Sequence, residues 1–297
     1  MKILIIGGTT YDSIIYLPQL PEPKPQTIHY APFHETMGST GAGKAIPLSK
    51  LNRSPILHSI IGNDPYGHKI IDDLEKEGVH FIYDFDPNGT ERHVNLMDPQ
   101  GGRISIFVTQ SSVELPLDMV RLEQCIEQCD LVVLNIIGYT KQLIPLVKKH
   151  RKPVWTDLHD YDLGNPYHED YIEIADTIFL SSDQLDDYRA VMMKWIAQGK
   201  ELVVCTHGKG GSTALTKEGK WLETPIIPDY PFVDANGAGD NFFVGYLYGF
   251  MNGKSVEESL RLGTICAGLC ISSKELACGE LSESLLEQEY RKYYGGL

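Results

Sequence analysis

The stretch of sequence that says most about the fold is Asp234–Gly249, which reads DANGAGDNFFVGYLYG. Its first half is a turn of small residues, and its second half is an apolar run with helical character. Small residues let a backbone approach a ligand closely, and glycines such as Gly237 and Gly239 permit unusual backbone angles. Successive amides at the start of such a helix point at one spot, with the positive end of the helix dipole behind them. We therefore expect the amides of Gly237, Ala238 and Gly239 to form an anion site suited to a transferring phosphoryl group.

Asp240 stands at the start of the expected helix. The dipole and the nearby amides favour its ionised form. An ionised carboxylate beside an anion site can accept a proton from a hydroxyl group while the hydroxyl oxygen attacks phosphorus. We predict that Asp240 is such a general base. Taken alone, Gly-Ala-Gly-Asp is at least as typical of a tight turn with an aspartate cap, so that alternative stays open at this point.

Farther out along the chain, short apolar runs alternate with helical patterns. The predicted strands, rich in β-branched residues, are Lys2–Ile6, Pro55–Ile61, Leu131–Asn135, Val154–Asp157, Thr177–Leu180 and Leu202–Thr206. The predicted helices are His68–Lys76, Leu117–Gln128, Thr140–His150 and Asp183–Gln198. This alternation predicts an α/β fold with a mostly parallel sheet and helices on both faces. In such folds the functional site lies at the carboxyl ends of the strands.

Two regions interrupt the alternation. Residues 13–37 are rich in proline and show no helical period, and residues 92–109 have the pattern of a β-hairpin. Strands outside the main sheet could form a small lid over its active edge. The sequence shows no linker, low-complexity tract or internal repeat. We therefore predict a single domain, residues 1–297, with lid segments at about 13–37 and 92–109.

Several stretches together resemble one family. Asp234–Phe242 resembles D-T-x-G-A-G-D-x-F, the carboxyl-terminal signature of ribokinase-like (PfkB) carbohydrate kinases. Four other stretches follow the order of that family's motifs, namely Ile6–Asp12, Gly38–Ala45, Ile61–Gly67 and Thr206–Gly211. The resemblance spans nearly the whole chain. It implies a ribokinase-like three-layer α/β/α sandwich with a mostly parallel central sheet and a small β lid.

The resemblance also implies an activity, which is ATP-dependent phosphorylation of a hydroxyl of a small sugar-type substrate with Asp240 as the base. The residues that it implies for the substrate are Asp12, Gly38, Gly41, Gly43 and Asn63. Those that it implies for the nucleotide are Thr206, Gly208, Gly210, Asn236 and Gly268. It implies Mg²⁺ between the β- and γ-phosphates, with Gln184 near magnesium-bound water, and in some members a K⁺ ion near Asp234.

Three departures from the family pattern bear on substrate and metal. The family's substrate-contacting Asn falls on Gly43, which offers no side-chain hydrogen bond. The family's N-x-x-E falls on Ser181–Gln184, where Gln184 lacks the charge of the Glu and Asp183 could substitute by a small shift. The two residues after Asp234 also differ from the usual threonines. The identity of the sugar and the strength of metal binding are therefore left open.

A second phosphate-binding pattern is present in Gly38–Lys44, which fits G-x-x-x-x-G-K. A P-loop continues with Ser or Thr to hold magnesium, and Ala45 cannot do so. The preceding Tyr30–Met37 lacks the pattern of a buried strand, and Pro47 would fit the following helix only within its first turn. We interpret this stretch as a glycine-rich substrate loop.

Composition excludes several classes of function. The formal net charge of −14 argues against a nucleic-acid partner, because phosphate backbones are bound by clustered Lys and Arg. No run reaches the roughly 18 apolar residues of a membrane span, and MKILIIGG is too short for a signal peptide, so a cytoplasmic location is expected. Six cysteines in 297 residues do not indicate a disulfide scaffold, and we expect free thiols.

Two alternative functions remain open from sequence. One is an adenosine-like nucleoside kinase of the same family. The other is a catalytically weak protein that binds a sugar or nucleotide, suggested by Gly43, Ser181 and Gln184, although the intact Gly237–Asp240 argues against it. Because an exposed small sheet favours burial, a homodimer through the lid is a further expectation.

Overall fold

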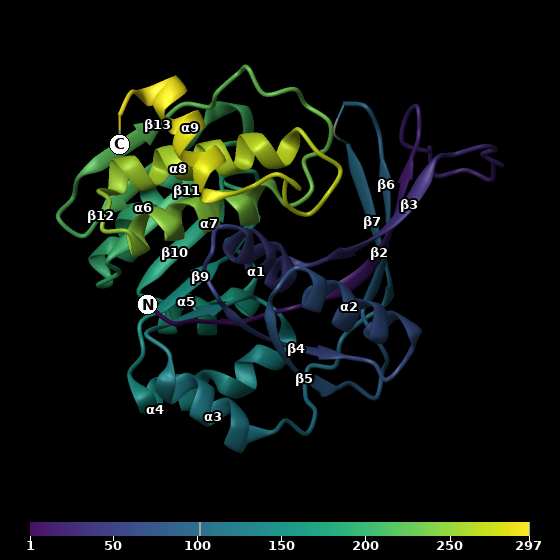
Figure 1. The fold of residues 1–297 in the computed structure, drawn as a ribbon, viewed down its shortest axis with the longest axis horizontal. Coiled ribbons are helices and arrows are strands. Elements are labelled where there is room, and N and C mark those ends of the chain that lie inside the picture. The colour runs from purple at the N-terminus through teal and green to yellow at the C-terminus, as the bar shows by residue number, and fades with distance from the viewer. Residues whose placement is uncertain (101, 297) are drawn as a thin grey trace.

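The computed structural model describes residues 1–100 and 102–296, and a nine-stranded sheet runs through the middle of the molecule (Figure 1). Its strands, in spatial order, are β13 (Trp221–Thr224), β12 (Ser212–Thr216), β11 (Leu202–Thr206), β10 (Thr177–Ser181), β9 (Val154–Asp157), β8 (Leu131–Leu134), β1 (Ile3–Ile6), β4 (Ile56–Ile61) and β5 (His80–Phe85). Neighbours from β11 to β5 pair in parallel, whereas β12 and β13 are antiparallel. The prediction of a mostly parallel sheet is confirmed.

The central strands are short and apolar because both faces of the sheet are covered. In β1, Ile3 and Ile5 enter one hydrophobic cluster, while Leu4 and Ile6 enter a second cluster on the other face. The first cluster includes side chains of α1 (Thr40–Lys50), α2 (Pro65–Lys76), α7 (Ala238–Met251), α8 (Val256–Ile271) and α9 (Glu283–Tyr294). The second includes side chains of α3 (Met119–Gln128), α4 (Ile144–His150), α5 (Glu169–Ile174) and α6 (Tyr188–Ala197). The three-layer α/β/α arrangement is thus confirmed.

Helix α7 is apolar on almost every side because it is enclosed by other elements. It packs closely on α8 through glycines. A Cβ atom on Gly245 would lie 2.8 Å from the Cα atom of Gly263 in α8, and one on Gly249 would lie 2.9 Å from the Cα atom of Ser259. This close approach fixes the axis of α7, and with it the position of the residues at its first turn.

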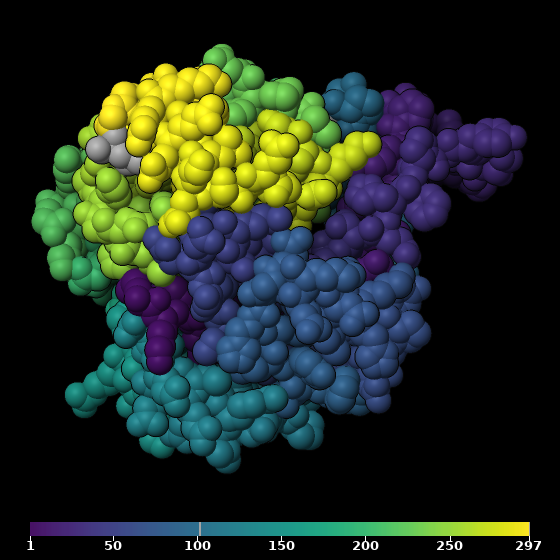
Figure 2. Space-filling model, viewed as in Figure 1, coloured from purple at the N-terminus to yellow at the C-terminus, as the bar shows by residue number. Residues whose placement is uncertain are grey.

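A second sheet has four strands in the order β3-β2-β6-β7 and stands apart from the central one (Figure 1). Its strands are β2 (Thr10–Tyr16), β3 (Phe33–Gly38), β6 (Arg92–Met97) and β7 (Arg103–Thr109). Strands β6 and β7 form the hairpin expected at 92–109, and β2 and β3 contain the two ends of the proline-rich segment 13–37. Residues between β2 and β3 form the extension that projects from the body in purple (Figure 2).

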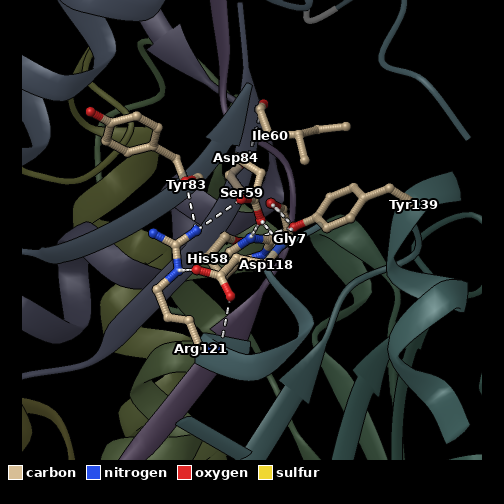
Figure 3. A network of polar contacts seen from close by, with 9 residues as sticks. All are labelled: Gly7, His58, Ser59, Ile60, Tyr83, Asp84, Asp118, Arg121 and Tyr139. Atoms are coloured by element: carbon tan, nitrogen blue, oxygen red, sulfur yellow. Dashed lines mark hydrogen bonds and ion pairs between the residues drawn. The ribbon is translucent and has the colours of Figure 1, made fainter. Parts of the chain in front are cut away.

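A buried polar network joins β4 and β5 to α3 and to the turn after β1 (Figure 3). The His58 ring nitrogens lie 3.1 Å from Oδ2 of Asp84 and 3.2 Å from the Tyr139 hydroxyl. Arg121 donates to the other oxygen of Asp84 at 3.0 Å, and Tyr139 donates to the Gly7 carbonyl at 3.1 Å. Burial lowers the pKa of His58 despite the adjacent Asp84 carboxylate, so the ring stays neutral near pH 7. The network holds the chain where it passes from β1 toward β2.

The predicted bounds agree well for the central strands and less well for the helices. Strands β9 and β11 have the predicted residues, whereas α3 and α6 begin later because the side chains of Asp118 and Asp187 cap them. The predicted helix at 140–150 is divided between a 3-10 helix (Gly138–Leu143) and α4. No helix among residues 1–100 and 102–296 is both long and apolar enough to cross a membrane.

One expectation about α1 was wrong. Pro47 lies in the interior of this helix and not in its first turn. Because proline lacks an amide hydrogen, the Gly43 carbonyl four residues earlier receives no helical hydrogen bond from it. The segment before α1 is also a strand, β3, although it belongs to the smaller sheet and only its last two residues are buried.

Candidate active site

A cavity of about 1050 Å³ lies between the carboxyl ends of the central strands and the four-stranded sheet. Asp157 at the end of β9, Ser181 at the end of β10 and Thr206 at the end of β11 all line it. Asp12 of β2 lines it from the smaller sheet, and Asp240 lines it from the first turn of α7. This is the edge of the sheet at which the alternation of strands and helices predicted a functional site.

The start of α7 presents backbone amides to this cavity. Its N-cap residue Gly237 has φ of 78°, in the left-handed region that favours glycine, and no side chain caps the helix. The amide of Ala238 donates to the carbonyl of Ala235 at 3.2 Å. The amides of Gly237, Gly239 and Asp240 have no acceptor among the residues that the structure describes. Two of the three predicted amides, those of Gly237 and Gly239, are thus available to an anion together with the Asp240 amide and the helix dipole, whereas the Ala238 amide has an acceptor in the chain.

Asp240 pairs with Lys44 of α1, whose side chain is fully buried. The Nζ atom of Lys44 also lies 3.1 Å from Oδ2 of Asp157. Burial alone would lower the pKa of Lys44, but the two carboxylates raise it, so Lys44 stays a cation. Burial would raise the pKa of Asp157, whereas the adjacent His159 and Lys44 lower it to about 2. The centre is therefore a buried ammonium shared between two carboxylates.

Asp157, His159 and Asp240 each present an oxygen or nitrogen within 4.8 Å of the others. Such groupings hold metal ions in many proteins. In the described chain, the cation that lies between the two carboxylates is the ammonium of Lys44. We therefore assign this position to Lys44.

Gly43 contacts the other side of the Asp240 carboxyl group. A Cβ atom on Gly43 would lie 2.9 Å from Cγ and 3.1 Å from Cβ of Asp240, which is closer than side chains pack. The Asn that the family has at this position cannot fit beside Asp240 as Asp240 is placed here. The absence of a side chain at Gly43 thus leaves room for the Asp240 carboxylate.

The smaller sheet supplies polar groups to another wall of the cavity. The backbone amide of His93 donates to Oδ1 of Asp12 at 3.2 Å. The ring nitrogen Nε2 of His93 lies 2.9 Å from Oε1 of Glu91. Burial raises the pKa of Asp12. Burial would also raise the pKa of Glu91, but hydrogen bonds from His93 and Ser111 lower it. Together these side chains offer donors and acceptors of the kind that bind substrate hydroxyls.

The remaining wall follows the ends of β10 and β11. Ser181, Asp183, Thr206 and Gly208 line the cavity there. Gln184 is exposed and lies outside the lining formed by the described residues. Of the two candidates to replace the family's Glu, Asp183 is thus the one that lines the cavity.

The predicted site residues fall into two groups. Those that line the cavity are Asp12, Thr206, Gly208, Asn236, Gly237, Ala238, Gly239 and Asp240. Those outside the lining formed by the described residues are Gly38, Gly41, Gly43, Asn63, Gly210, Gly268, Asp234 and Gln184. Several of the second group support lining residues, since a Cβ on Gly38 would lie 3.0 Å from Cγ of Asp12.

Three of the predicted residues outside the lining have other surroundings. Asn63 is exposed in the turn before α2. Gly268 lies in α8 against the Tyr230 ring, where a Cβ atom would lie 2.9 Å from Cγ of the tyrosine. The carboxylate of Asp234 accepts the amide hydrogen of Asn236 at 2.8 Å and the Tyr16 hydroxyl hydrogen at 3.2 Å.

Sequence reasoning did not identify several polar residues of the site. They are Lys44, Glu91, His93, Asp157 and His159. A signal for Asp157 was present, because an acidic residue that ends an apolar strand lies at the carboxyl edge of a parallel sheet. Lys44 carried a signal only as part of the rejected P-loop pattern.

The known proteins to which this chain is similar include several kinases. The family model described as "pfkB family carbohydrate kinase" matches residues 1–280. An acarbose 7(IV)-phosphotransferase of Actinoplanes sp. is 29% identical over 290 residues, covering 96% of each protein. The solved structure of a microbiome-derived acarbose kinase, Mak1, has a TM-score of 0.87 and 26% identity and covers 97% of this chain and 98% of its own. A Burkholderia thailandensis nucleoside kinase solved with inosine has a TM-score of 0.78 and 17% identity, with 99% and 98% covered.

Proposed function

We propose that this chain, which belongs to the pfkB family of carbohydrate kinases, transfers the γ-phosphoryl group of ATP to a hydroxyl of a small sugar-type substrate, with Asp240 as the base. One observation carries the assignment of the base. A carboxylate stands at the start of α7, beside amides without acceptors in the described chain, and faces a cavity large enough for both reactants. Phosphoryl transfer needs this combination of proton acceptor and anion site.

The reaction follows from these contacts. The substrate hydroxyl donates its hydrogen to a carboxylate oxygen of Asp240, and the proton passes to that oxygen as the hydroxyl oxygen bonds to the γ-phosphorus. The bond from that phosphorus to the β,γ-bridging oxygen breaks, and ADP leaves. The amides of Gly237, Gly239 and Asp240 donate to the transferring group, where negative charge accumulates. The smaller sheet covers the cavity and excludes water, which limits transfer to water in place of the sugar.

The nucleotide side of the cavity fits a magnesium nucleotide. Thr206 and Gly208 offer a hydroxyl group and a backbone that a phosphate can approach closely, and Asp183 offers the carboxylate oxygens that Mg²⁺ prefers, directly or through water. When bound, Mg²⁺ neutralises charge on the β- and γ-phosphates. A K⁺ ion at Asp234 remains an expectation from the family resemblance, and turnover in K⁺ against turnover in choline chloride tests it.

A sugar is the favoured acceptor. Asp12, His93 and Glu91 form a chain of donors and acceptors on the wall supplied by the smaller sheet, which suits several adjacent hydroxyl groups. The similarity to proteins named as acarbose kinases supports the same class. A nucleoside acceptor is the alternative, and its ribose hydroxyls would use the same wall. A third alternative is a protein that binds these ligands without turnover.

We also propose that two copies pair through the smaller sheet. The edge strand β7 of that sheet exposes three apolar side chains, those of Ile104, Ile106 and Val108. An exposed apolar edge strand favours association with a second copy. Sedimentation at micromolar concentration tests this, and a monomer at all concentrations would exclude it.

The test of the function is ATP turnover with Mg²⁺ over a panel of acceptors, which contains acarbose, ribose, deoxyribose, fructoselysine, adenosine and inosine. Asp240→Asn should keep ligand binding and lose about 10²- to 10⁴-fold in kcat, the usual contribution of a general base. Asp229→Asn, at an exposed position outside the cavity lining among the described residues, is the matched control. Near-normal turnover by Asp240→Asn would reject the base. Measurable binding with no turnover on any compound would favour the binding protein.

A further inference from the structure

The fully buried Lys44 is the least expected charged group in the molecule. An ammonium removed from water is strongly destabilised unless carboxylates surround it. Lys44 lies 3.1 Å from Oδ2 of Asp157 and pairs with Oδ1 of Asp240, and the Phe243 ring centroid is 5.0 Å away. A methionine of similar length would fill an apolar site without any charge, so packing alone does not account for a lysine.

Gly43 and Lys44 act on the same carboxylate from neighbouring positions of α1. Gly43 leaves the space in which the Asp240 carboxyl group lies, because a Cβ there would be 2.9 Å from its Cγ. Lys44 supplies the cation that draws the carboxyl group into that space. Gly43, which replaces the family's Asn, and the next residue, Lys44, thus act together on the Asp240 carboxyl group.

The charges around Asp240 indicate how Lys44 helps it to act as a base. The groups that face Asp240 are Lys44 from α1, Asp157 and His159 at the end of β9, and Cys270 from α8, whose thiol pKa burial raises to about 12. Two carboxylates share one ammonium in the resting site. When Asp240 takes up the hydroxyl proton, Lys44 and Asp157 remain as a balanced ion pair, so proton transfer leaves no unpaired charge.

We propose that Lys44 is a positioning residue, a built-in cation that holds the Asp240 carboxylate toward the cavity in a state ready to accept the substrate proton. The proposal rests on the proposed function, in which Asp240 is the base. It assigns to Lys44 no contact with substrate or nucleotide. Lys44 acts through Asp240, and Asp157 remains the counter-ion of Lys44 once Asp240 is protonated.

The experiment compares Lys44→Met with Lys220→Met, which removes an exposed lysine outside the cavity lining among the described residues. The acceptor is the panel compound with the highest turnover in the wild-type protein. Lys44→Met should lower kcat by about 10- to 100-fold while KM for ATP changes much less, because only the position of the base is disturbed. Without the ammonium, two carboxylates compete for one proton, so the acid limb of the pH–kcat profile should move up by about one pH unit or more.

A double variant separates charge from folding. Lys44→Met with Asp157→Asn removes one positive and one negative charge, so it keeps the charge balance of the cluster even if Lys44→Met alone folds poorly. Its acid limb should return toward the wild-type position, while kcat stays low because Asp240 has lost its hydrogen-bonding partner. A purely structural role for Lys44 predicts the same acid limb in all variants. That result, or a normal kcat in the folded double variant, would overturn the proposal.

A measurement without turnover separates failure of this proposal from failure of the proposed function. Melting temperatures of Lys44→Met, Asp240→Asn and their combination should be non-additive if the two side chains hold one another. Additive shifts would overturn the positioning role whatever the enzyme does. A wild-type protein that phosphorylates nothing but shows the coupling would reject the kinase function, and with it the catalytic meaning of the contact.

Discussion

Replacing Gly43 by alanine should damage catalysis more than stability. The change adds one methyl group on the inner face of α1, at 2.9 Å from Cγ and 3.1 Å from Cβ of Asp240. Ordinary packing begins at about 3.4 Å, so either the helix or the carboxyl group must move. The carboxyl group moves more easily because it turns about single bonds, and turning it takes its oxygen away from Lys44.

The magnitudes of the two effects can be compared. Overpacking a close contact costs about 1–3 kcal/mol. Within a helix, alanine is preferred over glycine by about 1 kcal/mol, which offsets part of this cost. The expected loss of stability is therefore about 0–2 kcal/mol. A displaced base lowers kcat by about 10- to 100-fold, or about 1.4–2.8 kcal/mol of transition-state stabilisation.

The assay is initial-rate kinetics with ATP, Mg²⁺ and the best acceptor of the panel, together with urea denaturation of the same samples. Gly164→Ala is the matched control, because a Cβ there meets only Oδ1 of Asp162 at 3.6 Å and the residue lies outside the cavity lining among the described residues. Gly43→Asn, which introduces the family's usual residue, should lose still more activity because it is larger. Wild-type kcat in Gly43→Ala, or a gain of activity in Gly43→Asn, would refute the reasoning.

Two further predictions concern strain and acid stability. Ser39 has φ of 71° and ψ of 162°, a region of backbone angles almost confined to glycine. Ser39→Gly should therefore raise the free energy of unfolding by about 1 kcal/mol, after the greater entropy of glycine in the unfolded chain is subtracted. A lower urea midpoint would contradict this. Because the folded pKa of Asp157 is depressed to about 2, its stabilising effect is present above its unfolded pKa and is lost as pH falls toward 2. The loss should be about 2 kcal/mol between pH 5 and pH 2, and Asp157→Asn should show a flatter dependence by that amount; an unchanged slope would contradict the assignment.

The central strands could be predicted because each is a short apolar run buried on both faces, as Ile3–Ile6 illustrates. The two antiparallel strands at one end of the central sheet could not. Ser212–Thr216 is buried along its whole length and Trp221–Thr224 only in part, but both carry polar residues, so neither is the purely apolar run that marks the parallel strands. Pro47 argued against a helix on local grounds, yet α1 passes through it because tertiary packing of the buried helix outweighs the lost hydrogen bond.

The candidate site also has parts that could be predicted from the sequence and parts that could not. Gly237–Asp240 and Thr206–Gly208 were predictable because consecutive residues form each of them, so a motif can describe them. The ion cluster could not be predicted, because Lys44 lies 113 residues from Asp157 and 196 from Asp240. No local pattern records such contacts, and the resemblance to a family carried no place for a lysine there. Asp183 and Gln184 could be told apart only in the structure, where Asp183 lines the cavity and Gln184 does not.

The ion cluster also bears on the choice between an enzyme and a binding protein. The departures at Gly43 and Gln184 suggested weakened function when each was considered alone. In three dimensions Gly43 makes room for the Asp240 carboxyl group and Lys44 holds it, so the two neighbouring positions serve one carboxylate. A buried lysine shared by two acids is unfavourable for folding unless it is well paired, and a protein that only binds a sugar gains nothing from it. Buried charges that perturb one another in a cavity are typical of sites where protons move. The departure that first counted against catalysis therefore counts in its favour.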